Sequence, residues 1–224
     1  MVGNGNTATY LDGRDRIAGG VYCEYVEEKY IRVLIACEFS GVVRDAFAAK
    51  GHDAWSCDIL PTERSGNHIQ RDVLEILNDG WDLMIAHPPC TYLSNAGARF
   101  LYPKGVLNTD RLAQGLDAKE LFMALLNADI PRICIENPIP SSAYLLPAYN
   151  QIIQPSYFGH PFQKRTCLWL KNLPPLMSTG IYETAESSKI AGNWFNKGGK
   201  ERQKNRAKTF QGIADAMSSQ WSDL

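Results

Sequence analysis

The sequence predicts an α/β protein with a mostly parallel sheet and helices on both faces. Short apolar runs with β-branched residues alternate with segments of helical periodicity from about Ile31 onward. This alternation is typical of strands joined by crossover helices, which run parallel and are covered on both faces. The length of 224 residues and a hydrophobic share of 45% allow one core of ordinary size, so one main domain is expected.

The first half of the chain predicts a βαβ unit and a third strand. Residues 31–36 have the apolar pattern of a buried strand, 42–50 that of a short helix, and 53–57 that of a second strand. A short helix is expected over residues 73–78, and a strand over 81–86. The carboxyl ends of these strands would meet at one edge of the sheet, where open α/β sheets bind their ligands.

The second half predicts two helices and two strands. A long helix is expected over residues 110–127, followed by a strand over 132–135 and a further strand over 167–170. The closing helix, 209–221, has apolar residues at helical spacing. Its apolar residues are Ile213, Ala216, Met217 and Trp221.

Composition divides the chain into four expected segments. Residues 1–30 are polar and predict a loosely ordered leader, and 31–176 would form the core domain. Residues 177–208 are basic and contain glycine, which predicts a loop region, and 209–224 would be a C-terminal helix packed on the core.

Global composition favours a reduced intracellular protein. The formal net charge is -1, so only local clustering would indicate a nucleic-acid partner. The six cysteines include no Cys-x-x-Cys pair and no zinc-ligand spacing, so no metal is expected. Without a secretory signal or an apolar run long enough to span a bilayer, we expect a cytoplasmic protein with no membrane partner. Nothing in the sequence predicts the oligomeric state.

Cys90 is the first candidate for catalysis. It follows the strand at 81–86 through His87-Pro88-Pro89, and the two prolines stop the strand because they remove two backbone donors. The thiol should therefore lie in a turned loop at the carboxyl edge of the sheet. Glu136 follows the strand at 132–135, so its carboxylate is expected at the same edge, although a helix cap is an alternative interpretation.

Two further turns predict a nucleoside site. Ser40-Gly41 follows the first strand and would let a ligand approach the backbone and the next helix N-terminus. Asp58 follows the second strand, where acidic residues bind ribose hydroxyls in nucleotide-binding sheets. The alternatives are a plain loop for Ser40-Gly41 and a helix cap or solvated turn for Asp58.

Taken in order, these segments resemble the DNA cytosine-5 methyltransferases, which use S-adenosyl-L-methionine (SAM). That family carries a Phe-Ser/Ala-Gly turn, two acidic residues, a Pro-Pro-Cys loop, a Glu-Asn-Val loop and a Gln-x-Arg-x-Arg segment. The matching stretches are Phe39-Ser40-Gly41, Asp58, Asp72, Pro88-Pro89-Cys90, Glu136-Asn137-Pro138 and Gln163-Lys164-Arg165-Thr166-Cys167. The resemblance covers about residues 31–170. It implies a Rossmann-like methyltransferase fold, and the small size is similar to that of phage- and prophage-encoded members, which act in the host cytoplasm.

The resemblance also implies residue roles. Cys90 would add to carbon 6 of cytosine, while Glu136, protonated or sharing a proton with the base, would bind ring nitrogen 3. Nearby positive charge, with Arg165 as the candidate, should lower the pKa of the thiol or hold the base. The implied SAM-binding residues are Phe39, Ser40, Gly41, Asp58, Asp72 and Pro88. The implied DNA contacts are Asn137, Gln163, Arg165, Lys197, Lys200 and Arg202.

Departures from the family pattern leave alternatives open. Val42 and Val43 replace further glycines of the first turn, which would narrow the cofactor site and favours a non-catalytic DNA-binding or decoy protein. His87 stands where a small residue is usual. Residues 166–208 are too few for the family's target-recognition domain, so we expect low sequence specificity, with single-stranded or distorted DNA as substrate, or else a free cytosine nucleotide.

The segment ahead of the last helix is basic. Lysines in a glycine-containing loop can neutralise phosphates, and Trp194 and Phe195 can stack on bases, so DNA contact is one interpretation. A solvated surface loop is the other. The basic residues are Lys189, Lys197, Lys200, Arg202, Lys204, Arg206 and Lys208.

Overall fold

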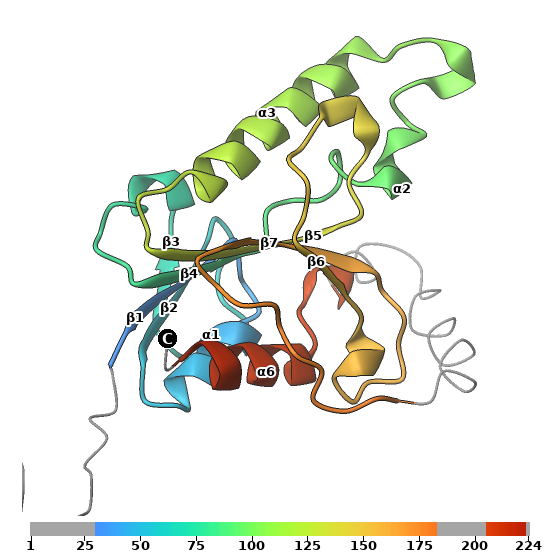
Figure 1. The fold of residues 1–224 in the computed structure, drawn as a ribbon. Helices are drawn as coiled ribbons and strands as arrows, with labels where there is room; N and C mark the ends of the chain where they lie inside the picture. The colour runs from blue at the N-terminus through green and yellow to red at the C-terminus, as the bar shows by residue number, and fades with distance from the viewer. Residues whose placement is uncertain (1–29, 183–204, 223–224) are drawn as a thin grey trace, which may run out of the picture.

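The computed structural model describes residues 30–182 and 205–222, which form a sheet covered by helices on both faces (Figure 1). Most of the predicted leader, Lys197, Lys200 and Arg202 lie outside the described residues. Within the described part of the chain the sheet has seven strands in the order β3-β2-β1-β4-β5-β7-β6. The strands are β1 (Arg32–Ala36), β2 (Asp53–Asp58), β3 (His68–Gln70), β4 (Leu83–Ala86), β5 (Arg132–Pro138), β6 (Gln151–Ile153) and β7 (Thr166–Lys171).

The sheet is mostly parallel, as predicted. Strands β1 to β5 pair in parallel with their neighbours, whereas β7 is antiparallel to both β5 and β6, so β6 runs in the same direction as β5. The strand order reverses between β1 and β4, which is the switch point where doubly wound sheets bind ligands. The arrangement is Rossmann-like with one reversed strand.

Helices cover the two faces of the sheet unequally. Figure 1 shows α1 (Val42–Ala48) and α6 (Gln211–Trp221) on one face and α3 (Thr109–Leu126) on the other. The shorter helical segments are α2 (Asn95–Ala98), η1 (Val73–Glu75), η2 (Pro103–Gly105), η3 (Ser142–Tyr144) and η4 (Pro155–Tyr157).

Two apolar clusters form the core, one on each face. The face covered by α1 and α6 buries Phe47 and Trp221, and the face covered by α3 buries Phe122 against Trp169. Every residue of β4 is buried, as expected of a central parallel strand covered on both sides. No helix in the described part of the chain is long and apolar enough to span a membrane.

One predicted boundary was wrong in a way that matters for the site. The strand predicted to end at residue 135 continues to Pro138, so Glu136, Asn137 and Pro138 belong to β5 and not to a following loop. The parallel pairing with β4 ends at Ile135, but the antiparallel partner β7 extends the pairing to Pro138. Glu136 therefore stands on a paired strand, where its backbone is fixed on one side by β7.

Candidate active site

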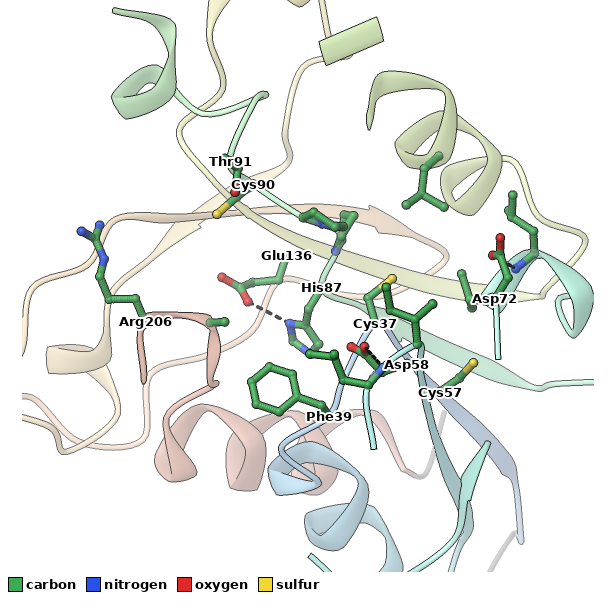
Figure 2. A pocket seen from close by; sticks show the side chains of 18 of the residues that line it. Cys37, Phe39, Cys57, Asp58, Asp72, His87, Cys90, Thr91, Glu136 and Arg206 are labelled. Atoms are coloured by element: carbon green, nitrogen blue, oxygen red, sulfur yellow. Dashed lines mark hydrogen bonds and ion pairs between the residues drawn. The ribbon is translucent and has the colours of Figure 1, made fainter. Parts of the chain in front are cut away.

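A single large cavity brings together most of the predicted site residues. It has a volume of about 1130 Å³ and lies where β1, β2, β4 and β5 end, so it spans the switch point of the sheet. Figure 2 shows the side chains that line it. We call one part the thiol end, lined by His87, Pro88, Pro89, Cys90, Glu136, Lys164 and Arg206. The other is the aspartate end, lined by Phe39, Asp58, Ile59, Leu60, Asp72 and Leu74.

The loop that carries Cys90 is held against β5. The His87 amide donates to the Ala36 carbonyl at 2.9 Å, which continues the strand pairing to the last residue before the prolines. The Asn137 side chain is buried, and its Nδ2 donates to the Pro88 carbonyl at 3.1 Å. Asn137, predicted to contact DNA, instead lies outside the cavity wall and fixes the turn from behind. Cys90 itself is exposed and faces the cavity.

Glu136 and His87 form a close pair. Their Oε2 and Nδ1 atoms are 2.8 Å apart, and their side chains are only 12% and 6% exposed. Burial would raise the pKa of Glu136, but the charge of Lys164, the contact with His87 and a hydrogen bond from Thr166 outweigh burial and lower it from 4.5 to about 2. Glu136 is therefore an anion at neutral pH. The sequence interpretation required a protonated or proton-sharing carboxyl, which Glu136 alone does not provide in this state.

The thiol is not activated in the way the sequence predicted. Although Cys90 has exposed surface, partial burial of its thiol in the cavity wall and the negative charge of Glu136 raise its pKa, while Lys164 and Arg206 oppose the rise only in part. Arg165, the predicted source of positive charge, is exposed and does not line the cavity. Its neighbour Lys164 does, because successive side chains of an extended segment point to opposite sides.

Lys164 and Arg206 join two distant segments at the thiol end. The Lys164 Nζ donates to the Arg206 carbonyl at 3.0 Å, so the residues ahead of β7 are tied to the residues ahead of α6. The sequence analysis missed Lys164 and His87 as site residues, and it counted Arg206 only in the basic segment. The signal that could have found Lys164 is the alternation of side chains that leads into the buried Thr166. By the same alternation Gln163, which was predicted to contact DNA, is exposed in the same way as Arg165.

The aspartate end combines two carboxylates with aliphatic side chains. Asp58 Oδ1 accepts a hydrogen bond from the Leu60 amide at 2.9 Å, and Asp72 Oδ1 accepts one from the Leu74 amide at 3.0 Å, where Asp72 caps η1. Both aspartates thus hold their own turns as well as lining the cavity, and burial raises the pKa of Asp58. The neighbouring Ile59 side chain is exposed, so this end has an apolar rim.

The turn at Ser40-Gly41 has a structural role that the sequence did not predict. The buried carboxylate of Glu38 accepts hydrogen bonds from the Val43 amide at 2.8 Å and from the Ser40 hydroxyl at 3.1 Å. This carboxylate therefore occupies the N-terminus of α1, where a ligand was expected to approach. Gly41 has φ 71°, and a Cβ there would lie 2.5 Å from a guanidinium nitrogen of Arg44, so its glycine makes room for Arg44.

The valines after this turn do not narrow the cavity. Val42 and Val43 are buried in the core cluster that contains α6, and neither lines the cavity. The departure from the family pattern therefore affects the core and leaves the aspartate end open.

One residue of the basic segment, Lys208, is engaged within the protein. Its Nζ forms an ion pair with the Glu63 carboxylate at 2.6 Å.

No group of His, Cys, Asp or Glu side chains suited to a metal ion occurs among residues 30–182 and 205–222. No protein-family model matches the sequence, and no curated protein matches it. Among solved structures, a similar one is described as a "putative DNA modification methyltransferase encoded within prophage" from E. coli. The identity is 17%, the TM-score is 0.43, and the match covers 68% of this chain and 52% of that one. The chain thus spans about half of that protein, and a likeness of this degree supports no functional argument.

Proposed function

We propose that this protein transfers a methyl group from SAM to carbon 5 of cytosine in DNA, through a covalent adduct between Cys90 and carbon 6 of the base. One observation carries the proposal: the Cys90 thiol and the Glu136 carboxylate line the same cavity as Asp58 and Asp72. A nucleophile and an acidic group beside a nucleoside-sized site are what this reaction needs. The resemblance of the motifs to the DNA cytosine-5 methyltransferases agrees with this arrangement.

At the thiol end, Cys90 provides the nucleophile. Carbon 5 of cytosine becomes nucleophilic when a thiolate adds to carbon 6, because the electron pair of the 5,6 double bond then moves toward carbon 5. A proton held between the Glu136 carboxyl and ring nitrogen 3 would stabilise the charge that develops there. After methyl transfer, a solvent water takes the carbon 5 proton and the thiolate leaves carbon 6, which restores the aromatic ring and releases the enzyme.

The aspartate end suits SAM. Its adenosine has a flat apolar ring and two ribose hydroxyls, and this end offers the aliphatic side chains of Ile59, Leu60 and Leu74 beside the carboxylates of Asp58 and Asp72. Carboxylates in this position accept hydrogen bonds from ribose hydroxyls in nucleotide-binding sheets. Bound there, SAM supplies the methyl group from its sulfonium. The cavity volume of about 1130 Å³ exceeds what one ligand of this size usually fills, which leaves room for a base.

We propose DNA as the substrate, with the target base extruded into the thiol end. Extrusion from a duplex costs a few kcal/mol, so single-stranded or distorted DNA should be favoured. Lys164 and Arg206 supply positive charge beside Cys90 for a phosphate of the strand. The same two cations suit the phosphate of a free cytosine nucleotide, which is the second candidate substrate. Either substrate requires the same chemistry.

The test is transfer of a labelled methyl group from SAM to a cytosine-containing single strand, the matching duplex and deoxycytidine monophosphate. We expect the single strand to be methylated fastest and Cys90→Ser to show no turnover. Cys134→Ala is the matched control, because Cys134 is a buried thiol outside the cavity. Transfer only to the mononucleotide would favour the second candidate, and undiminished transfer by Cys90→Ser would remove the proposed mechanism.

A strand with 5-fluorocytosine at the target position tests the adduct itself. Fluorine at carbon 5 cannot leave as a proton, so the bond between Cys90 and carbon 6 should persist. We expect a denaturant-resistant complex with the wild-type protein and none with Cys90→Ser, as read by mass spectrometry. Adduct formation on any other residue would contradict the assignment of Cys90.

A further inference from the structure

His87 has the features of a functional side chain and not of a core residue. It follows β4 directly, its side chain is 6% exposed, and it lines the wall of the cavity next to Glu136. It also lines a second, small cavity of about 10 Å³ beside Glu38 and Ser40. A buried imidazole bonded to a buried carboxylate at a cavity wall is a pair that can exchange a proton.

The hydrogen bond between His87 and Glu136 can form with the proton on either side chain. At 2.8 Å, Nδ1–H of the imidazolium donates to a carboxylate oxygen, and after transfer the carboxyl O–H donates back to Nδ1 over the same distance. The other ring nitrogen, Nε2, is buried and has no hydrogen-bond partner among the described residues. Among the described residues, Glu136 is therefore the hydrogen-bond partner of the ring.

Glu136 alone does not meet the requirement of the reaction. The charge of Lys164 and the contact with His87 lower its pKa to about 2 despite burial, so at neutral pH it is a carboxylate that can accept a hydrogen bond but cannot donate a proton. Ring nitrogen 3 of cytosine has a lone pair and needs a donor when the thiolate adds. The proton must come from a neighbour of Glu136.

We propose that His87 and Glu136 hold one proton between them and deliver it to ring nitrogen 3 of the target cytosine. The inference rests on the proposed function, since it concerns the same base and the same adduct. His87 acts through Glu136, so it is a positioning residue that also supplies the proton. Cytosine is the pyrimidine that fits this pair, because its nitrogen 3 has a lone pair that can take the delivered proton, whereas nitrogen 3 of thymine already carries a hydrogen and cannot take another.

The step balances within the site. The thiolate electron pair forms the bond from sulfur to carbon 6, the 5,6 π pair moves to the bond between carbons 4 and 5, and the π pair of the C4–N3 bond moves to nitrogen 3. Nitrogen 3 takes the carboxyl proton, and Glu136 receives the Nδ1 proton, which leaves a neutral imidazole protonated at Nε2. When the thiolate leaves after methyl transfer, the proton returns along the same route.

Charged groups of both signs lie near the pair. Glu38 lines the small cavity together with His87, and Lys164, at the same end of the large cavity as Glu136, lowers the pKa of that carboxyl. The titratable and charged groups that line the two cavities with His87 at this end are Cys37, Glu38, Cys90, Glu136, Lys164 and Arg206.

The test compares His87→Asn with His87→Ala. The Asn amide places a hydrogen-bond donor close to the position of Nδ1, so it can still hold Glu136, but it cannot give up a proton. We expect both variants to lose about 10²-fold or more in the rate of methyl transfer. His52→Asn is the control, because His52 is a half-buried histidine outside the cavity.

The outcomes separate the inference from the proposed function. Activity of His87→Asn within a few fold of wild type, with only His87→Ala impaired, would show that His87 merely orients Glu136 and would overturn the inference while the proposed function stands. Absence of transfer by the wild-type protein would overturn the proposed function and the inference with it.

Discussion

The two ends of the cavity are built in different ways. At the thiol end, polar side chains are bonded to residues far away in the sequence: His87 to Glu136, Asn137 to Pro88, and Lys164 to the Arg206 carbonyl. At the aspartate end, Asp58 and Asp72 each accept a hydrogen bond from the amide two residues further along, so their geometry is local.

This difference has a consequence for the chemistry. At the thiol end the ionisation of each group depends on its neighbours, because the same charges that lower the pKa of Glu136 also act on Cys90. At the aspartate end, each carboxylate is fixed without the other. We therefore expect substitutions at the thiol end to change several properties of that end together, and substitutions at the aspartate end to leave the reactivity of Cys90 unchanged.

Glu136→Gln should give the largest effect on methyl transfer. It should lower the rate of transfer and raise the rate at which Cys90 is alkylated. Loss of the carboxylate removes the partner of ring nitrogen 3, so methyl transfer should fall by roughly 10²- to 10³-fold. The negative charge of Glu136 raises the pKa of Cys90, so its removal should make Cys90 react faster with iodoacetamide at pH 7. Peptide mapping of the alkylated protein gives the second rate, and a slower reaction would contradict the electrostatic account.

The same variant should change how stability depends on pH. The folded pKa of Glu136 is about 2 against an ordinary value of 4.5, so its contribution is complete above pH 4.5 and is lost as pH falls toward 2. The full contribution is about 3 kcal/mol, of which about 1 kcal/mol should be lost by pH 3.5. Urea unfolding at pH 6 and 3.5 should therefore show a smaller loss of stability in Glu136→Gln than in the wild type.

Asp58→Asn should change the loss of stability on acidification in the opposite direction from Glu136→Gln. Burial raises the pKa of Asp58, which means that the ionised form costs stability in the folded state, and this cost disappears as the group is protonated. Asp58→Asn removes that gain on acidification, so this variant should lose more stability than the wild type between pH 6 and 3.5. Equal acid sensitivity of the Glu136 and Asp58 variants would contradict the distinction between the two ends.

Asp58→Asn should also weaken SAM binding without touching the thiol. An Asn at this position can still accept the Leu60 amide hydrogen bond, so the turn should persist. The loss of a charged acceptor for the ribose should cost roughly 10-fold in affinity. Calorimetry with SAM gives the affinity, and the rate of Cys90 alkylation should equal that of the wild type. A change in that rate would mean that the two ends are coupled.

Much of the fold could be predicted because it depends on local patterns. Buried apolar runs predicted the strands β1, β2, β4 and β7, and apolar periodicity predicted the helices α1, α3 and α6. The predicted bounds of these elements are close to the observed ones. The three-residue strands β3 and β6 are too short to show an alternation. The continuation of β5 through Glu136 depends on pairing with β7, a contact between distant segments that no local pattern records.

The candidate site was predictable only in part for the same reason. Cys90 follows β4 and Asp58 ends β2, so their place at the edge of the sheet follows from parallel topology. Asp72 was expected there only from the family resemblance, because β3 ahead of it was not predicted. The sequence could not show that Glu38 folds back onto α1, because that contact depends on the left-handed turn at Gly41. It also could not show that His87 faces Glu136, since this depends on the register between β4 and β5, although a single crossover between these strands makes them expected neighbours.

The smallest expected effect tests which cation acts on the thiol. Lys164 lowers the pKa of Cys90, whereas Arg165 is exposed and lies outside the cavity wall. Lys164→Met should therefore raise the thiol pKa further and slow alkylation of Cys90 several-fold at pH 7, because the remaining cation, Arg206, opposes the rise only in part. Arg165→Met, one residue away and of equal charge change, should alter the rate little, since an exposed charge is screened by solvent. The reverse ranking would restore the sequence-based assignment of Arg165 and place the side chain of Lys164 outside the cavity in solution.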